Sequence, residues 1–268
     1  MIKFVEKGHR YESIEGEPIN WKSVTQVTKT IQEPFDAEVM AEKSSKNRKS
    51  KWYKMSKEEI LQCWKYTSDI SIELGNWYHK DREKQLCSIN SVEIEGINCS
   101  VSVPNIIGGE KLAPNQVLDD NWVYPEHMVY LKSEGICGQS DLVEVVNGRV
   151  NIIDYKSNKE MTTSGYKSWD GKTKKLRFPC DHLDDCKLNV YNIQLSLYMY
   201  IILKHNPHLK PGKLVIQHVL FKEVGKDPLG NPINARDGND EPIVEDVVIY
   251  ELPYLKKEVM NILKNIKK

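Results

Sequence analysis

The chain of 268 residues lacks both a long apolar run and an excess of charge of either sign. No apolar segment approaches the roughly 20 residues that a membrane-spanning helix needs, and the opening residues, MIKFVEKGHRYESIEG, contain no apolar core of a secretion signal. Lys plus Arg and Asp plus Glu number 38 each, so the net charge of zero provides no general attraction to nucleic acid or to a membrane. We therefore expect a soluble, cytoplasmic protein with no membrane partner, in which any polyanion-binding site is local.

A disulfide framework is also missing. The cysteines stand at scattered positions: Cys63, Cys87, Cys99, Cys137, Cys180 and Cys186. Scattered cysteines in an intracellular chain are typical of reduced thiols. Cys180 and Cys186 flank His182, but their spacing matches no common zinc finger and no second pair follows. We therefore expect unligated thiols.

No internal repeat and no long low-complexity segment divides the sequence. With 40% hydrophobic residues, the chain can bury a core as one domain. We expect this domain to consist of an N-terminal extension (residues 1–69), a core (residues 70–222) and a C-terminal strand and helix (residues 223–268). In the extension, HRYESIEGEPINW predicts a small hairpin and SVTQVTKTI predicts the beginning of a helix.

The longest predicted helix begins after Ser56. This serine suits an N-cap and Glu59 suits the third helical position of a capping box, and SKEEILQCWKYTSDISIELGNWYHKDREKQL reads as helical from there. Residues 88–122 then mix Pro, Gly and Asn with apolar residues, which indicates an insertion or a loose β region. The closing LKKEVMNILKNIKK is typical of an amphipathic helix with a solvated basic face.

Three consecutive strands are predicted by HMVYL, ICGQSDLVEVV and RVNIIDYKS, and Asn147-Gly148 between the last two is typical of a type I′ hairpin turn. Because the strands leave this turn antiparallel, Asp141 and Asp154 lie at matching distances from it, and we expect their carboxylates to meet at one end of the sheet. LNVYNIQLSLYMYIILKH then predicts a helix, and KLVIQHVLF predicts a further strand. These elements indicate an α/β fold with a central mixed sheet flanked by helices.

Asp154 and Lys156 bring opposite charges to the end of an apolar run. Residues two apart in a strand point to the same face, so the carboxylate and the ammonium are expected side by side. Hard cations such as Mg²⁺ bind carboxylates, water and phosphate oxygens, and a neighbouring lysine can orient the water or balance the phosphate charge. The alternative is a solvated ion pair at the end of a strand, which these residues alone would favour.

Four short motifs occur in order along the chain: Gly75-x-x-x-His79, Gly138-x-x-Asp141, Asp154-Tyr155-Lys156 and Gln194-x-x-x-Tyr198. Together they resemble the RecB-type branch of the PD-(D/E)xK nuclease superfamily, and within it the viral and mitochondrial single-strand DNA exonucleases. The resemblance covers roughly residues 70–205, about half of the chain. The proline that the superfamily's name places before the first aspartate is absent here, although this branch often has glycine in that region.

The resemblance implies a restriction-endonuclease-like core in αβββαβ order behind an N-terminal helical extension, and it implies Mg²⁺ or Mn²⁺ as the cofactor. The metal ligands that it implies are His79, Asp141, Asp154 and the backbone carbonyl of Tyr155. Apart from the resemblance, Glu126 precedes the first core strand and could approach a second metal, whereas His79 alone would be interpreted as an exposed helix histidine.

The catalytic residues that the resemblance implies are Asp141, Asp154, Lys156, Gln194 and Tyr198. The lysine would act at the phosphate, and the glutamine and tyrosine would hold the lysine or the phosphate. Some relatives also bind an iron–sulfur cluster through cysteines that follow the last motif. No cysteine follows Cys186, so we expect no iron–sulfur cluster.

Two basic tracts contain aromatic residues. The candidate DNA-binding residues of the first, KSSKNRKSKWYK, are Lys46, Arg48, Lys49, Lys51, Trp52 and Tyr53; those of the second, GYKSWDGKTKKLRF, are Trp169, Lys172, Lys174, Lys175 and Arg177. Cations among aromatic rings suit single-stranded DNA, because phosphates meet the cations while bases stack on the rings. The alternative is two solvated loops with incidental aromatics.

From these features we expect a Mg²⁺- or Mn²⁺-dependent deoxyribonuclease, acting as an exonuclease on single-stranded DNA or free DNA ends. Water would attack the phosphodiester without a covalent enzyme intermediate. One alternative is an endonuclease or junction resolvase of the same superfamily. Another is a catalytically idle DNA-binding protein on this fold, although such a protein has no need of Asp141, Asp154 and Lys156 together.

Overall fold

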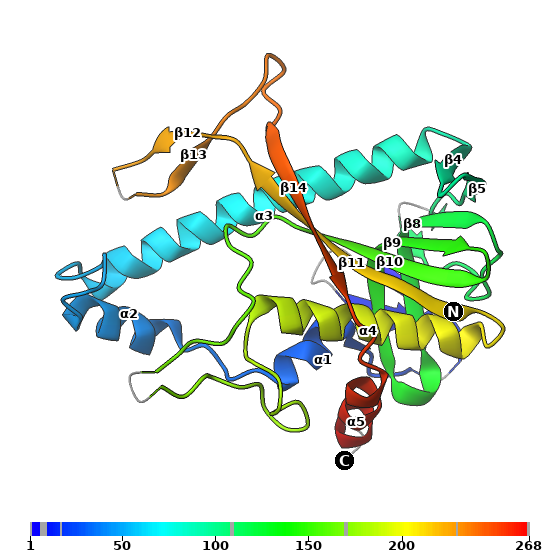
Figure 1. Cartoon of the computed structure of the whole chain (residues 1–268), viewed down its shortest axis with the longest axis horizontal. Coiled ribbons are helices and arrows are strands. Elements are labelled where there is room, and N and C mark those ends of the chain that lie inside the picture. The colour runs from blue at the N-terminus through cyan, green and yellow to red at the C-terminus, as the bar shows by residue number, and fades with distance from the viewer. Residues whose placement is uncertain are drawn as a thin grey trace.

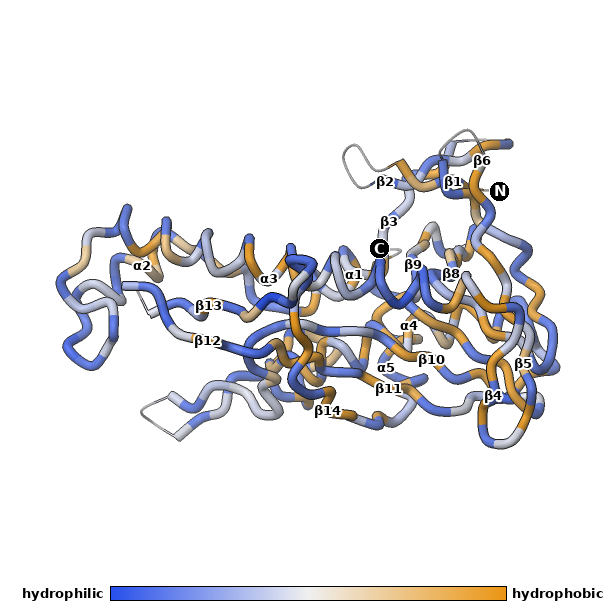
Figure 2. The backbone as a smooth tube through the Cα atoms, turned by 90° about the horizontal axis from the view of Figure 1, so that it is seen from above, coloured by the Kyte–Doolittle hydropathy of each residue, from blue (hydrophilic) through white to orange (hydrophobic). Residues whose placement is uncertain are grey.

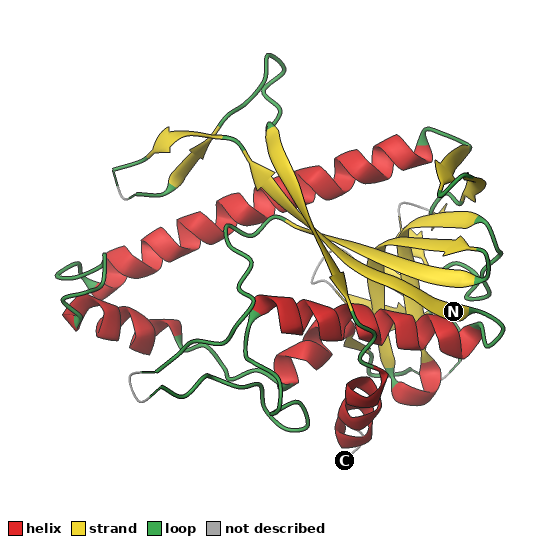
Figure 3. Ribbon diagram, viewed as in Figure 1, coloured by secondary structure: helices red, strands yellow, loops and turns green. Residues whose placement is uncertain are grey.

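The computed structural model of the chain describes residues 2–5, 10–16, 18–107, 110–168, 171–228 and 230–266. Helices flank a large, curled, mixed β-sheet (Figure 1, Figure 3). Its strands are, in spatial order, β14 (Val244–Leu252), β11 (Lys210–Phe221), β10 (Arg149–Lys156), β9 (Ile136–Val146), β8 (Trp122–Leu131), β5 (Ile97–Val101) and β4 (Ser91–Ile94). A short strand, β3 (Lys22–Ser23), pairs with β9. The predicted α/β class with a central mixed sheet is therefore confirmed.

The predicted order of helix, three strands, helix and strand is present as α3 (Lys57–Cys87), β8, β9, β10, α4 (Lys187–His205) and β11. Strands β8, β9 and β10 form an antiparallel meander. Strand β11 pairs with β10 in parallel, which requires a crossover connection, and α4 lies in that connection. The turn between β9 and β10 has positive φ at both central residues, 51° at Asn147 and 67° at Gly148, as a type I′ turn requires.

Alternate residues of the strands face two different hydrophobic cores. Ile152 of β10 packs with residues of α4, α1 (Val24–Thr30) and α5 (Lys256–Ile266), whereas Ile153 and Tyr155 pack with residues of α3. The sheet is therefore covered on both faces, with α3 on one side and α4 on the other.

Helix α3 begins as the sequence predicts. Ser56 accepts a hydrogen bond from the amide of Glu59, and the Glu59 side chain accepts one from the amide of Ser56, which completes a capping box. From Ile70 onward this 31-residue helix contributes to the core beneath the sheet, through residues such as Leu74 and Tyr78. Its first half extends beyond the sheet.

This first half of α3 and helix α2 (Ala37–Lys46) form an arm, which also includes the connection between them, residues 47–56 (Figure 1, Figure 2). Ala41 of α2 and Ile60 and Cys63 of α3 are buried within the arm. A hairpin of β12 (Glu223–Lys226) and β13 (Pro232–Asn234) lies beside α3. Thr67 of α3 donates a 2.9 Å hydrogen bond to Asn231 in the loop of this hairpin. The arm is therefore stabilised by its own buried residues and by a contact with the hairpin.

A second sheet contains β2 (Arg10–Ser13), β1 (Ile2–Val5), β7 (Glu110–Leu112) and β6 (Ile106–Ile107) in that order. The prediction of a hairpin within HRYESIEGEPINW is wrong, because Arg10–Ser13 pairs with the preceding strand, Ile2–Val5. Pro18 lacks the amide that a return strand would need there. By contrast, the β character predicted for residues 88–122 is confirmed by β4, β5, β6 and β7.

The predictions about thiols and membranes can also be compared with the structure. All of the cysteines lie within the described residues, where each is a free thiol, and all except Cys87 are buried. No helix in the described ranges has the length and apolar character required to cross a bilayer.

Candidate metal centre

Strands β9 and β10 separate where their acidic residues occur. Their pairing ends at Ile153 opposite Leu142, and the next residues along the two strands are Asp154 and Asp141, in the register that the sequence predicts. Beyond this point the amide of Tyr155 donates a 2.7 Å hydrogen bond to Asp141 Oδ2. The side chain of Asp141 thus satisfies an amide that strand pairing leaves free, and the end of the sheet opens.

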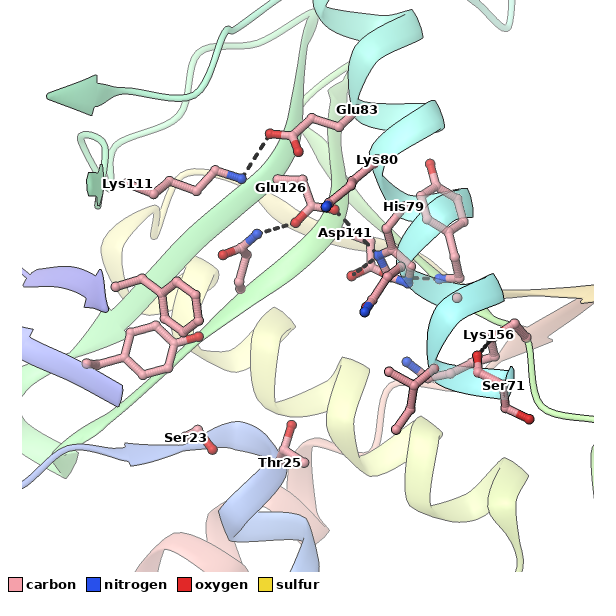
Figure 4. A pocket seen from close by; sticks show the side chains of 18 of the residues that line it. Ser23, Thr25, Ser71, His79, Lys80, Glu83, Lys111, Glu126, Asp141 and Lys156 are labelled. Carbon is pink, nitrogen blue, oxygen red and sulfur yellow. Dashed lines mark hydrogen bonds and ion pairs between the residues drawn. The ribbon is translucent and has the colours of Figure 1, made fainter. Parts of the chain in front are cut away.

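Three potential metal ligands meet at this opening: His79 of α3, Glu126 of β8 and Asp141 of β9 (Figure 4). His79 Nδ1 lies 3.5 Å from Glu126 Oε1 and 3.5 Å from Asp141 Oδ1. One ligand atom from each residue lies within 4.8 Å of the other two, and within the described ranges no other group of His, Cys, Asp or Glu side chains is so placed. A metal-binding triad is therefore available.

The backbone of Glu126 is distorted in the middle of its strand. Its φ angle is 49°, a left-handed value that costs a non-glycine residue about 1–3 kcal/mol. The strand pairing continues on both sides, with Pro125 opposite Leu142 and His127 opposite Ser140. In this conformation the Glu126 carboxylate accepts a hydrogen bond from Gln139 and approaches His79. Such strain is typical of functional sites, and here it accompanies a candidate ligand.

Asp154 lies next to the triad but outside it. It is 1% exposed, its Oδ2 forms an ion pair with Lys156, and its Oδ1 is 3.4 Å from the amide nitrogen of Gln194. The same Gln194 nitrogen is 3.5 Å from the hydroxyl of Tyr198. The structure thus places the predicted catalytic residues together. The roles of Asp154 and of the Tyr155 carbonyl as metal ligands stay predictions.

Two motif glycines permit close approaches between elements. A Cβ added to Gly138 would lie 2.7 Å from a ring carbon of Tyr198, and one added to Gly75 would lie 2.8 Å from Ser157 Oγ. Real Cβ atoms essentially never approach this closely. Gly138 therefore makes room for the tyrosine of α4 beneath β9, and Gly75 allows α3 to reach the end of β10.

The ring of Tyr155 packs beside His79 and restricts the orientation of its imidazole. It packs edge-on against the imidazole at 5.5 Å and against the ring of Tyr78 at 5.3 Å. Such edge-to-face pairs are favourable and directional. Burial on β10 thus helps to orient the imidazole of His79 toward the two carboxylates.

The triad opens into a cleft of 1220 Å³. One wall is the exposed face of α3, and the facing wall is formed by α1 and by Phe4 and Tyr11 of the small sheet. Lys156 and Lys80 also line it. Lys29 and Lys111 complete the set of lysines among its described lining residues, so the acidic centre shares with four lysines one space that is open to solvent and large enough for a nucleotide-sized ligand.

The charges at the site shift one another's pKa values. Burial lowers the pKa of His79, but the carboxylates of Glu126 and Asp141 outweigh it and raise the value to about 9. Burial, followed by the charge of Asp154, raises the pKa of Asp141 to about 7. Burial alone would lower the pKa of Lys156, whereas Asp154 and Asp141 raise it above the ordinary lysine value. The carboxylates thus favour the charged forms of His79 and Lys156, whereas burial and Asp154 disfavour the charged form of Asp141.

The site's charge and donor atoms fit a divalent cation. In the ionised forms that bind a metal, Glu126, Asp141 and Asp154 carry three negative charges and Lys156 one positive charge, so the sum is minus two once His79 is neutral. A metal-bound imidazole must be neutral. Carboxylate oxygens suit Mg²⁺ and Mn²⁺, and an imidazole nitrogen favours transition metals such as Mn²⁺. The residues present therefore fit the predicted cofactor.

Two further residues of the site were not predicted. Gln139 donates to Glu126, and the ring of Tyr191 lies 4.9 Å from the ammonium of Lys156. The spacing of each residue from a predicted site residue could have identified it. Gln139 is two residues before Asp141 on one strand face, and Tyr191 is three residues before Gln194 on one helix face.

The first predicted DNA-binding tract lies at the tip of the arm, between α2 and α3. Its members are Lys46, Arg48, Lys49, Lys51, Trp52 and Tyr53. Lys46 forms an ion pair with Glu42 at 2.5 Å, whereas Lys51 lies 4.1 Å from the centre of the Trp52 ring. No residue of this tract lines the cleft, so any contact with a substrate there would be remote from the triad.

The second tract is neutralised within the chain. Lys174 pairs with Asp185 at 2.7 Å, Lys175 with Asp184 at 2.6 Å and Arg177 with Glu33 at 2.8 Å. Lys172 lies in the same loop, and Trp169 falls outside the described residues. The described residues of the tract do not line the cleft. Their role in DNA binding stays a prediction, with structural ion pairs as an alternative role for three of the cations.

Comparison with known proteins adds no relative to this picture: no protein-family model matches the chain, and neither does any curated protein or solved structure.

Proposed function

We propose that the chain is a Mg²⁺- or Mn²⁺-dependent deoxyribonuclease of the PD-(D/E)xK type, with a restriction-endonuclease-like core, that acts on single-stranded DNA or free DNA ends as an exonuclease. The observation that carries the proposal is the convergence of His79, Glu126 and Asp141 beside the buried pair of Asp154 and Lys156, at the open end of the sheet. A structural role explains one buried ion pair, but it does not explain three further metal-ligand side chains at the same place.

The arrangement of the motifs supports the proposal. The glycine of one motif accommodates the tyrosine of another, at Gly138 and Tyr198, and the glycine before His79 accommodates the residue after Lys156. The motifs are separated along the chain, yet the first lies against the end of the third, and the second lies against the fourth. This is the expected behaviour of parts of one active site rather than of coincidental matches.

In this proposal His79, Glu126 and Asp141 hold the metal, and Asp154 and the Tyr155 carbonyl are further candidate ligands beside them. A bound divalent cation would activate water for attack and neutralise charge on the phosphodiester. Lys156 is held between the Asp154 carboxylate and the ring of Tyr191 on the wall of the cleft. From there its ammonium can donate a hydrogen bond to a phosphate oxygen or to the attacking water.

Gln194 and the second oxygen of the metal ligand Asp141 act by positioning. The Gln194 amide lies at the second oxygen of Asp154 and so limits the rotation of the carboxylate that holds Lys156. Asp141 uses one oxygen to hold the backbone of Tyr155 and presents the other toward His79. Rigid ligands of this kind keep a metal site near its productive geometry.

The proposal is tested by incubating the purified chain with end-labelled linear single-stranded DNA, in Mg²⁺, in Mn²⁺ and in EDTA, and with the same strand as a closed circle. We expect cleavage of the linear strand in either metal, none in EDTA, and a far lower rate on the circle. Cleavage that persists after thorough chelation would contradict the metal mechanism. Equal rates on circle and linear strand would instead support an endonuclease, and no cleavage under any condition would support an idle DNA-binding protein.

A further inference from the structure

Helix α3 connects the metal centre to the arm without a break. The residues of α3 that line the cleft lie on one face, and Ser68, Ile72, Asn76 and His79 follow one another at the spacing of helical turns. Trp64 extends the same stripe by one turn beyond Ser68. Fifteen residues separate Trp64 from His79, which corresponds to about 22 Å at the helical rise.

Three aromatic rings meet at the arm's end of this stripe. The ring of Trp64 lies 5.9 Å from that of Phe35 and 6.4 Å from that of Trp52. Phe35 is 69% exposed, and both tryptophans are half-buried. Single exposed apolar residues are ordinary on a protein surface, but contacting rings from three chain segments form an accessible aromatic cluster, which we define as Phe35, Trp52 and Trp64.

Cations accompany this cluster. The Lys51 ammonium lies 4.1 Å from the ring centre of Trp52, and that of Lys54 lies 5.5 Å from the ring centre of Tyr53. Among the described residues neither lysine pairs with a carboxylate, in contrast to Lys174 and Lys175 of the other basic tract. A partner for this surface should therefore offer both flat apolar faces and negative charge.

We infer that the aromatic cluster stacks unpaired bases of the strand whose phosphate occupies the metal centre, an inference that rests on the proposed function. Single-stranded DNA offers flat bases and a phosphate at every nucleotide. Paired bases are already stacked inside a duplex, so a duplex cannot use the rings in this way. At about 3.4 Å per stacked base, the distance along α3 spans about six nucleotides.

The test measures binding by fluorescence anisotropy of labelled oligothymidylates of about 4 and about 12 nucleotides, with Ca²⁺ in place of Mg²⁺ or Mn²⁺, so that the carboxylates hold a cation for the phosphate while the proposed cofactor for cleavage is absent. At about 3.4 Å per stacked base the shorter strand covers about 14 Å, which is less than the distance from the metal centre to the cluster. Replacing Phe35 by alanine should weaken binding of the longer strand by about 5- to 150-fold and leave that of the shorter strand unchanged, so the ratio of the two affinities should fall by the same factor. Phe35→Trp, which retains a stacking surface, should restore the affinity.

Ile249→Ala is the control, because Ile249 is 56% exposed and lies outside the cleft, the cluster and both basic tracts. It should leave the affinity for the longer strand unchanged. Thermal unfolding of each variant establishes that the substitution acts on the surface rather than on folding. An unchanged affinity of Phe35→Ala for the longer strand, or equal losses for the two strands, would overturn the inference.

The inference and the proposed function fail separately. If the wild type cleaves linear DNA and the Phe35→Ala variant binds the longer strand with wild-type affinity, the nuclease proposal stands and the stacking inference is refuted. If Phe35→Ala weakens binding of the longer strand but the wild type never cleaves it, the stacking inference stands and the nuclease proposal is refuted. Tighter binding of a duplex than of the single strand would also overturn the inference, because the stacking faces would then have no ligand.

Discussion

The backbone amide of Tyr155 donates a 2.7 Å hydrogen bond to Asp141 Oδ2, while Asp141 Oδ1 lies 3.5 Å from His79. The Asp141 carboxylate therefore connects β9 to β10 where their backbone pairing ends, and it also presents an oxygen to His79. Its structural contribution and its charge can be tested separately, because asparagine retains an oxygen that accepts a hydrogen bond but carries no charge.

Asp141→Asn should lose metal binding and gain stability at alkaline pH. Burial raises the pKa of Asp141 to about 7, above its unfolded value of 3.8, so the ionised form destabilises the fold increasingly as pH rises from about 4 to about 7. We expect the variant to be about 1–4 kcal/mol more stable than the wild type at pH 8, with no gain below about pH 4. Chemical denaturation at both pH values measures the difference.

Metal affinity in Asp141→Asn should fall by at least the roughly 10–100-fold that is typical when a partner of a metal site is lost. Glu144→Gln is a matched control on the same strand, because burial raises the pKa of Glu144 as well but this residue does not line the cleft. It should bind metal as the wild type does. A variant Asp141→Asn with unchanged metal affinity would exclude Asp141 as a ligand.

Metal binding should release protons at neutral pH. The carboxylates of Glu126 and Asp141 raise the pKa of His79 to about 9 against the effect of burial, so the imidazole is protonated at pH 7 and must lose its proton to bind a metal. Affinity for Mg²⁺ should rise about tenfold per pH unit between pH 7 and pH 8.5. Calorimetry in two buffers with different ionisation enthalpies should detect release of at least about one proton at pH 7, and a heat independent of the buffer would contradict this assignment.

Gly138→Ala should be destabilising mainly through its contact with Tyr198, with a further close contact of 3.3 Å to Val24. The added Cβ would lie 2.7 Å from the ring of Tyr198, and overpacking of this kind typically costs about 1–3 kcal/mol. Combining it with Tyr198→Leu should recover part of the loss, because the smaller side chain vacates the space. Gly225→Ala is the control, since no atom lies within 4 Å of the added Cβ there. Additive losses in the double variant would show that this contact is not the cause.

Much of this site follows from local sequence signals. The Asn147-Gly148 turn sets the register of β9 and β10, so the meeting of Asp141 and Asp154 is predictable from two symmetrical distances along the chain. Glu126 is different. A left-handed φ directly after Pro125 inside a paired strand has no sequence signature, and the distortion becomes visible only when α3 and β9 are placed around it.

Long-range ion pairs are equally hidden from the sequence. The basic tract near Arg177 reads as a free cationic surface, but its charge partner Glu33 is 144 residues away along the chain. The first tract gives the same local signal without such neutralisation at Lys51, which pairs with no carboxylate among the described residues. Composition alone cannot distinguish these cases, because the carboxylates are brought in by tertiary packing.

The most direct test of the nuclease proposal compares two lysines three residues apart. Lys156 lines the cleft beside Asp154, whereas Lys159 lies outside the cleft. With linear single-stranded DNA at saturating concentration and Mn²⁺ present, Lys156→Ala should cleave at least about 100-fold more slowly than the wild type, as expected when a cation at the scissile phosphate is lost. Lys159→Ala should cleave at the wild-type rate. Wild-type cleavage by Lys156→Ala would contradict the account, because the pair of Asp154 and Lys156 would then be an ordinary ion pair at the end of a strand.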